Sequence, residues 1–322
     1  MSMRLSPILL KFAVLFLVAV NPVHADEPGT VLEILAERDR GLIRDLEAYL
    51  HDHPTAEDRD QAYLKIFETA IDNDWFTQTE TTANEYLAAN PEGAVRPMAQ
   101  IVSTMARAQA GKYSEAWTVY DQLIQSLEGA DQEEFAASFA DALASEASGA
   151  GKTDVARQVY ETLLKKYGDN PALRQKVQDD LARIDMVGKP APVLAVMDLK
   201  GEPVRLADYQ GKYLLVDFWA TWCAPCLADL PKLQSAYKRY HDRGFDIISV
   251  SLDETPEAVS AFVKDRKIPW RQIHSPTSGG DLIAAYGVSN IPASFLIDPE
   301  GKVVRIDLRG EALGKALENL IK

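Results

Sequence analysis

Hydrophobic and polar positions follow two different patterns along this chain of 322 residues. Residues 27–186 lack strand-like alternation and are rich in Ala, Glu, Gln, Leu and Arg, a composition that favours helices. From Pro192 onward, short apolar runs alternate with amphipathic stretches, which is typical of a sheet whose strands are joined by helices. Gly188 and two prolines separate the two patterns and end the last helix of the first. The chain therefore predicts an all-α domain followed by an α/β domain.

The C-terminal segment predicts a hairpin and then an alternating α/β order. The hairpin joins 193–199 to 204–206 across a turn. Further strands are expected at 213–219, 245–252, 271–274, 293–297 and 303–308. Helices are expected at 227–241, 256–267 and 281–286, and from Glu311 to the end. This order suits an α/β sheet with helices on both faces.

The helical segment contains an internal repeat. Residues 111–123 align with 151–163, and Gly, Lys, Ala, Val, Tyr and Leu recur in register. Fainter copies lie at 31–50 and 74–91. A small alanine followed four residues later by a tyrosine suits the packing of helical hairpins, so this segment resembles tetratricopeptide repeats. We predict a helical tetratricopeptide-like domain of about three hairpins over 26–187, which could serve as binding surface, dimerisation element or spacer.

The first 25 residues have the pattern of a secretory signal. Arg4 and Lys11 flank or interrupt an apolar stretch, and Val23-His24-Ala25 forms a small-residue cleavage site. The continuous apolar run 12–20 is about half of the length that spans a bilayer. We therefore predict a cleaved signal peptide over 1–25 and a periplasmic or other extracytoplasmic location, with an uncleaved membrane anchor as the alternative.

The excess negative charge is confined to the helical domain. The net charge is −14, and residues 26–187 hold 15 basic and 31 acidic residues, whereas 188–322 hold 17 of each. Such a surface disfavours nucleic acid as a partner. A solvated acidic face accounts for the charge, and a basic protein partner bound to the helical domain is the alternative.

The two cysteines of the chain, Cys223 and Cys226, lie where the strand at 213–219 gives way to a helix. The free N–H groups and the positive dipole at a helix start favour a thiolate at Cys223. A thiolate is the attacking group in thiol–disulfide exchange. A zinc site needs further Cys or His ligands at a suitable spacing, which this sequence lacks. A structural disulfide across so short a loop adds little stability, so the pair predicts redox chemistry and no metal site.

Residues 216–226, with the sequence VDFWATWCAPC, resemble the active-site segment of thioredoxins. Pro231 matches the proline that kinks the thioredoxin active-site helix, and 290–298 resemble the cis-proline loop and the strand after it. The segment 253–270 is longer than in classical thioredoxins and resembles the insert of the TlpA/ResA-like thiol-disulfide oxidoreductases. This resemblance covers about 190–322 and implies a thioredoxin-like domain over 188–322 that uses no cofactor.

The resemblance implies roles for three catalytic residues. Cys223 is expected to be the exposed nucleophile and Cys226 the shielded resolving thiol. Asp217 is a charge within an apolar strand, and burial should raise the pKa of such a carboxyl. In thioredoxins the matching aspartate takes up the proton of the resolving thiol. A structurally hydrogen-bonded carboxylate is the alternative, because Ser249 falls where thioredoxins have a lysine that pairs with this acid.

The resemblance also implies a substrate-binding set. The bond between Ile291 and Pro292 is expected to be cis, which would place the Ile291 backbone beside Cys223 for pairing with an extended substrate. Pro292 should also keep metals from the dithiol. Trp222 is expected to form a surface platform beside the nucleophile, and Pro225 lies between the two cysteines.

These observations predict an exported thiol-disulfide oxidoreductase that reduces extracytoplasmic protein disulfides. Ala224 and Pro225 carry no polar group, whereas disulfide donors of the DsbA type have a histidine there. The family implies apocytochrome or copper-site cysteines as substrates, hence a role in cytochrome c maturation, and a membrane electron donor of the CcdA/DsbD type. The alternatives are a periplasmic disulfide donor or isomerase and a tetratricopeptide-like scaffold with an accessory redox domain. A peroxidase is disfavoured because its P-x-x-x-[TS]-x-x-C pattern is missing before Cys223.

Overall fold

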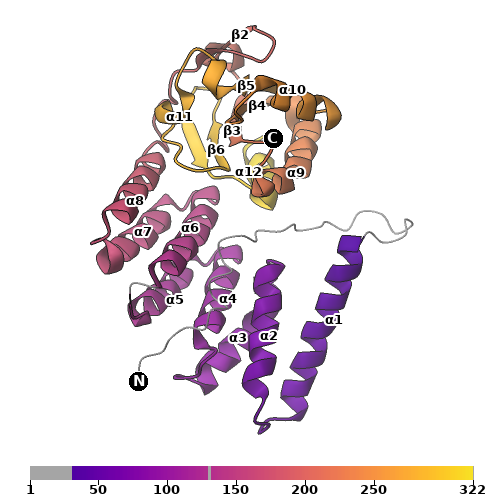
Figure 1. Ribbon diagram of the computed structural model, residues 1–322, viewed down its shortest axis with the longest axis vertical. Coiled ribbons are helices and arrows are strands. Elements are labelled where there is room, and N and C mark those ends of the chain that lie inside the picture. Colours follow the sequence, from indigo (N-terminus) through magenta and orange to yellow (C-terminus); the bar gives the residue numbers. More distant parts are fainter. Residues whose placement is uncertain (1–30, 130–131, 322) are drawn as a thin grey trace. The chain divides into compact units, whose positions relative to one another are not determined.

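The computed structural model in Figure 1 describes residues 31–129 and 132–321. The chain divides into two compact units, Met1–Leu143 and Ala144–Lys322. The predicted signal peptide, 1–25, lies outside the described residues. Across the described ranges, the helices are all too short or too polar to cross a bilayer.

The first unit is helical. Its helices are α1 (Val31–Asp52), α2 (Arg59–Asp72), α3 (Phe76–Ala89), α4 (Arg96–Gln109), α5 (Tyr113–Ser126) and most of α6 (Glu133–Gly149). Consecutive helices from α1 to α5 pack against one another. Tyr63 of α2 meets Tyr86 of α3 edge-to-face, with ring centroids 4.7 Å apart, and both rings are buried. The predicted all-α segment is confirmed.

The two copies of the sequence repeat have similar local structures. The first copy forms α5 and the second forms α7 (Thr153–Tyr167) of the second unit. The glycine before each helix has a left-handed φ, 78° at Gly111 and 77° at Gly151, which favours glycine because it has no Cβ. The alanine and tyrosine that recur in the two helices are buried in both (Ala116, Ala156, Tyr120, Tyr160). With α8 (Pro171–Ile184), the described residues before the α/β part hold eight helices, two more than three hairpins would give.

The C-terminal part of the second unit is α/β (Figure 1, orange to yellow). The predicted hairpin is formed by β1 (Ala195–Met197) and β2 (Pro203–Arg205), which pair antiparallel. A five-stranded sheet follows in the order β5-β4-β3-β6-β7. Its strands are β3 (Tyr213–Trp219), β4 (Phe245–Ser251), β5 (Arg271–His274), β6 (Ala293–Ile297) and β7 (Val303–Ile306). β3, β4 and β5 are parallel, whereas β6 and β7 are antiparallel to their neighbours.

Helices cover both faces of this sheet, as predicted. They are α9 (Ala224–Tyr240), α10 (Pro256–Asp265), α11 (Leu282–Ala285) and α12 (Gly310–Leu320). The face that carries Leu215 and Trp219 packs against α9, α10 and α12. On the other face, Phe218 contacts Tyr286 just after α11, with ring centroids 5.5 Å apart. The thioredoxin-like fold class is thus confirmed, and the middle of β3 is enclosed between two helical layers.

Candidate active site

The dithiol lies at the start of α9, and its two cysteines form a disulfide. The helix begins at Ala224, three residues earlier than predicted, because Cys223 is its N-cap and Pro225 suits a first turn. Cys223 Sγ accepts a hydrogen bond from Cys226 N at 3.3 Å. A sulfur in this position receives both a backbone donor and the positive end of the helix dipole. The geometry therefore suits a stabilised thiolate at Cys223 once the disulfide is reduced.

The exposure expected for Cys223 is wrong for the disulfide form. Cys223 is 3% exposed and Cys226 is 6% exposed, so the first cysteine is not the more accessible one. Both pack into the apolar cluster around Trp219 and Ala220, which covers the two sulfurs alike. The cysteines differ instead in what they face: Cys223 caps the helix, and Cys226 lines a cavity.

Asp217 lies in the middle of β3, on the face covered by α9. It stands opposite Ser249 in the pairing with β4, and Ser249 Oγ donates a hydrogen bond to Asp217 Oδ2 at 3.1 Å. Trp270 Nε1 donates in turn to Ser249 Oγ at 2.8 Å. Burial raises the pKa of Asp217 to about 7, and the Asp229 carboxylate adds to the rise, while the Ser249 hydrogen bond and Arg309 oppose it. The raised pKa expected from the sequence is present.

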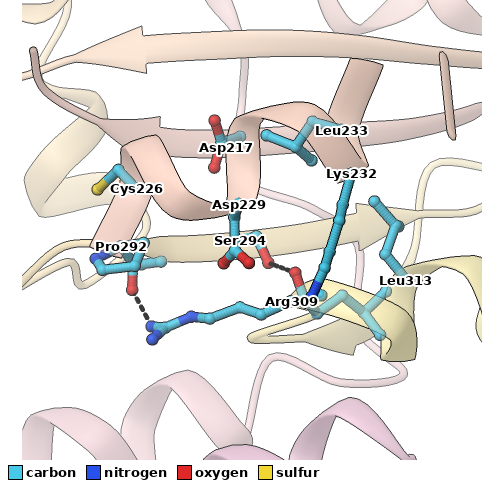
Figure 2. Close-up of a pocket in the computed structure, with 12 residues that line it drawn as sticks. Asp217, Cys226, Asp229, Lys232, Leu233, Pro292, Ser294, Arg309 and Leu313 are labelled. Atoms are coloured by element: carbon cyan, nitrogen blue, oxygen red, sulfur yellow. Dashed lines mark hydrogen bonds between the residues drawn. The ribbon is translucent and has the colours of Figure 1, made fainter. Parts of the chain in front are cut away.

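A small cavity connects Cys226 to Asp217 (Figure 2). Its wall is formed by Asp217, Cys226, Asp229, Lys232, Leu233, Pro292, Ala293, Ser294, Leu308, Arg309, Gly310 and Leu313. It offers about 10 Å³ to the centres of water molecules, which is room for about one water. Cys226 and Asp217 therefore line the same water-sized cavity.

Three charged residues of the cavity wall were not predicted: Asp229 and Lys232 of α9, and Arg309 after β7. Burial raises the pKa of Asp229, whereas Arg309 and Lys232 lower it. Asp229 follows Cys226 by three helical positions, and this spacing could have revealed that the two share a face. Arg309 gave no such signal, because only the folded chain brings it to the cavity.

The Ile291–Pro292 peptide bond is cis, as the resemblance implied. Ile291 packs against the cluster that contains both cysteines, and Pro292 lines the cavity beside Cys226. Trp222 is 66% exposed, next to Cys223, and Pro225 is exposed as well. The structure thus gathers the predicted residues at one end of β3 and α9. Their roles in binding substrate remain predictions.

A second network, absent from the sequence predictions, fixes the loop before the dithiol. Asp253 accepts hydrogen bonds from Thr221 N at 3.1 Å and from Thr221 Oγ1 at 2.6 Å. Ser251 Oγ also donates to Asp253, at 2.7 Å. Asp253 lies two residues after the end of β4, and a charge just after an apolar strand was the available signal. Thr221 precedes Cys223 by two residues, so the Asp253 carboxylate holds the backbone just before Cys223 in place.

Comparisons with known proteins match the C-terminal part of the chain. Residues 187–306 match the model of the AhpC/TSA family. The thiol-disulfide oxidoreductase ResA of Bacillus thuringiensis subsp. konkukian is 41% identical over 138 residues, which cover 42% of this chain and 77% of that protein. ResA of Bacillus subtilis is 34% identical over 119 residues, covering 37% and 65%. The crystal structure of the thioredoxin domain of a Bacteroides vulgatus thiol-disulfide oxidoreductase is 36% identical, with a TM-score of 0.39, and covers 42% of this chain and 98% of that one.

Proposed function

The chain belongs to the ResA-like thiol-disulfide oxidoreductases, and from this premise we propose that it is an exported reductant of extracytoplasmic protein disulfides. The observation that carries the proposal is the cavity that joins the resolving Cys226 to the buried Asp217. A proton acceptor behind the second thiol serves the step that releases the reduced substrate. The helix start supports the other half of the cycle, since it suits a thiolate at Cys223.

The cycle has two exchanges. In the first, the Cys223 thiolate attacks one sulfur of the substrate disulfide; a bond forms between Cys223 and that sulfur, and the other substrate sulfur leaves as a thiolate and takes a proton from water. In the second, Cys226 loses its proton to Asp217 and attacks Cys223 Sγ. The Cys223–Cys226 disulfide forms and the second substrate thiolate leaves. Two electrons pass from the enzyme dithiol to the substrate disulfide.

The raised pKa of Asp217 suits the second exchange. With a pKa of about 7, the carboxyl is about half ionised near neutral pH, and a base is most effective when its pKa lies close to the working pH. An aspartate with an ordinary pKa would be ionised too, but it would be a weaker acceptor for a thiol proton. Burial on β3 therefore raises the basicity of a carboxyl that lines the same cavity as Cys226.

Substrate binding and electron supply complete the proposal. The cis loop at Ile291 and the exposed Trp222 flank the dithiol, so an extended peptide can pair with the Ile291 backbone by strand addition. The signal pattern of 1–25 supports export. In that compartment the oxidised dithiol needs electrons from a membrane donor, and the CcdA/DsbD type is the class that the family implies. Apocytochrome or copper-site cysteines are the proposed substrates.

Reaction of the reduced protein with a disulfide-containing protein tests the proposal. The wild-type chain should end as the Cys223–Cys226 disulfide while the substrate gains two free thiols. Cys226→Ser should stall as a mixed disulfide through Cys223, because the resolving thiol is gone, and Cys223→Ser should trap no substrate. Non-reducing gels and thiol counting follow all three. Equal trapping by both variants would show that the roles are misassigned, and a wild-type protein that stays reduced would contradict the reductant function.

A further inference from the structure

The buried acid of this site lacks a cationic partner on the neighbouring strand. Ser249 stands opposite Asp217 on β4 and offers a hydroxyl hydrogen bond at 3.1 Å but no charge. On β6, the residue opposite Asp217 is Ser294, which is also neutral. The strand residues paired with Asp217 therefore supply no positive charge to this carboxyl.

Charged and titratable groups reach the cavity from two other elements. α9 contributes Cys226, Asp229 and Lys232, and the fourth residue, Arg309, lies just before α12. Asp229 disfavours the ionised form of Asp217, whereas Arg309 favours it. Lys232 acts on Asp229. Arg309 is thus the cation of the cavity wall whose charge acts on the buried acid.

The Arg309 side chain is held in place by backbone contacts. Its Nη2 donates a hydrogen bond to the Pro292 carbonyl, and Figure 2 shows the side chain extended along the cavity to reach it. The backbone that carries Arg309 is tied to β6, since Ser294 Oγ donates to Leu308 O at 3.1 Å and Asp307 N donates to Ser294 O at 2.8 Å. Within the described chain, Arg309 Nε is buried without a hydrogen-bond partner. A buried nitrogen with no partner is a cost to the fold, and the Pro292 carbonyl is the acceptor that the structure shows for this guanidinium.

We propose that Arg309 is a positioning residue of the proton-transfer site, which supplies from the loop before α12 the positive charge that allows Asp217 to ionise beside Cys226. The same side chain links this charge to the substrate loop, because its anchor is the carbonyl of the cis-proline. The inference rests on the proposed function, in which Asp217 is the base for Cys226.

The test compares substitutions that separate charge from hydrogen bonding. Arg309→Gln keeps a donor for the Pro292 carbonyl but removes the charge, and Arg309→Lys keeps the charge. Lys232→Gln is the matched control, since it removes the other cation of the cavity wall. Thermal unfolding identifies folded variants, and Arg309→Met replaces the Gln variant if that one does not fold. Carbon-13 NMR titration of the Asp217 carboxyl and the pH dependence of mixed-disulfide release are measured for each.

We expect Arg309→Gln to raise the pKa of Asp217 by about one unit, the lower end of what a neighbouring opposite charge contributes. Release at pH 7 should then be roughly five-fold slower, because about one carboxyl in ten would remain ionised. Arg309→Lys should restore most of both values, and Lys232→Gln should change them less than Arg309→Gln does. An unchanged Asp217 titration in folded Arg309→Gln would overturn the proposal, as would an equal shift in Lys232→Gln.

The same measurements separate this inference from the function on which it rests. Asp217→Asn reports on the base itself: if release in that variant keeps its wild-type rate, Asp217 is not the base and the positioning role of Arg309 fails with it. If Asp217→Asn slows release but Arg309→Gln shifts neither the titration nor the rate, the base assignment stands and the Arg309 proposal alone is wrong.

Discussion

The buried position of Asp217 is unfavourable for its charge and useful for its proposed role as a base. Asp217 is an acidic residue in the central strand of a sheet covered on both faces, and one serine hydroxyl is the hydrogen-bond donor that the structure shows at its carboxylate. Burial without a full set of donors disfavours the charged form, which accounts for the pKa of about 7. The property that makes Asp217 suitable as a base should therefore also make the folded protein sensitive to pH.

We expect Asp217→Asn to stabilise the oxidised protein above neutral pH. The carboxyl has a pKa of 3.8 as reference and about 7 in the fold, so the folded state holds an extra proton between these values. The free energy of unfolding of the wild type therefore falls as the pH rises through that window, by about 4 kcal/mol at most. The variant lacks this loss, so its advantage should grow from pH 4 to pH 8.

Denaturant unfolding at several pH values measures this advantage. Asp242→Asn, which removes an exposed carboxylate of the same domain, controls for the general effect of one negative charge. A stability difference between Asp217→Asn and wild type that is the same at pH 4 and pH 8 would show that folding does not shift the pKa of this carboxyl.

At the scale of elements, the start of α9 sets the surroundings of the dithiol. Cys223 caps the helix, and the donor to its sulfur is a backbone N–H of the first turn. Ala224 and Pro225, the two residues between the cysteines, are exposed and carry no polar group. A helix start of this kind stabilises the Cys223 thiolate through the backbone, with no contribution from a side chain between the cysteines.

The reduction potential should reflect this helix start. We expect the wild-type disulfide to lie nearer −270 mV, the value of thioredoxin, than −120 mV, the value of DsbA. Combining Ala224→Pro with Pro225→His should raise the potential, because an imidazole can stabilise the reduced thiolate. Ala224→Pro with Pro225→Phe is the control, since it adds a ring without a nitrogen. Equilibration with glutathione buffers gives all three values, and a wild-type potential near −120 mV would favour a disulfide donor.

At the scale of the whole molecule, the last helical pair belongs to the same compact unit as the sheet. Arg183 of α8 is buried, donates to Asp180 at 2.7 Å and lies 3.7 Å from Asp307, just after β7. Burial alone would lower the pKa of Arg183, but the Asp307 and Asp180 carboxylates outweigh it and keep the pKa above its usual value. Asp307 precedes Arg309 by two residues, so this ion pair joins α8 to the loop that carries Arg309.

Arg183→Met should destabilise the Ala144–Lys322 unit by about 3 kcal/mol, because it leaves Asp307, whose side chain is only 10% exposed, without its cation. Lys176 still pairs with Asp180 at 2.9 Å, which limits the loss. Arg157→Met is the control: it breaks the more exposed pair with Asp185 and should change the unfolding free energy by less than about 1 kcal/mol. Urea unfolding of the full chain compares the two, and equal effects would mean that the Arg183 network contributes no more than a surface pair.

The sequence by itself determined the features that consecutive residues encode. Strands β3, β5 and β6 have the predicted bounds, because a short apolar run between turn residues leaves little choice of register. The dithiol and the cis-proline loop were found in the same way, as compact motifs. The burial of Asp217 followed from its apolar neighbours in β3. Each of these predictions depends on periodicity or spacing within one short segment.

Only the tertiary structure decided which distant residues meet. Arg309 reaches the cavity through the pairing of β6 with β7 and the loop before α12, and Asp253 reaches Thr221 because β3 and β4 lie side by side. The burial of Cys223, which the sequence predicted wrongly, depends on the side chains packed around the disulfide. Contacts of this kind are set by strand order and helix packing, which no local pattern contains, and they decide the charge around Asp217.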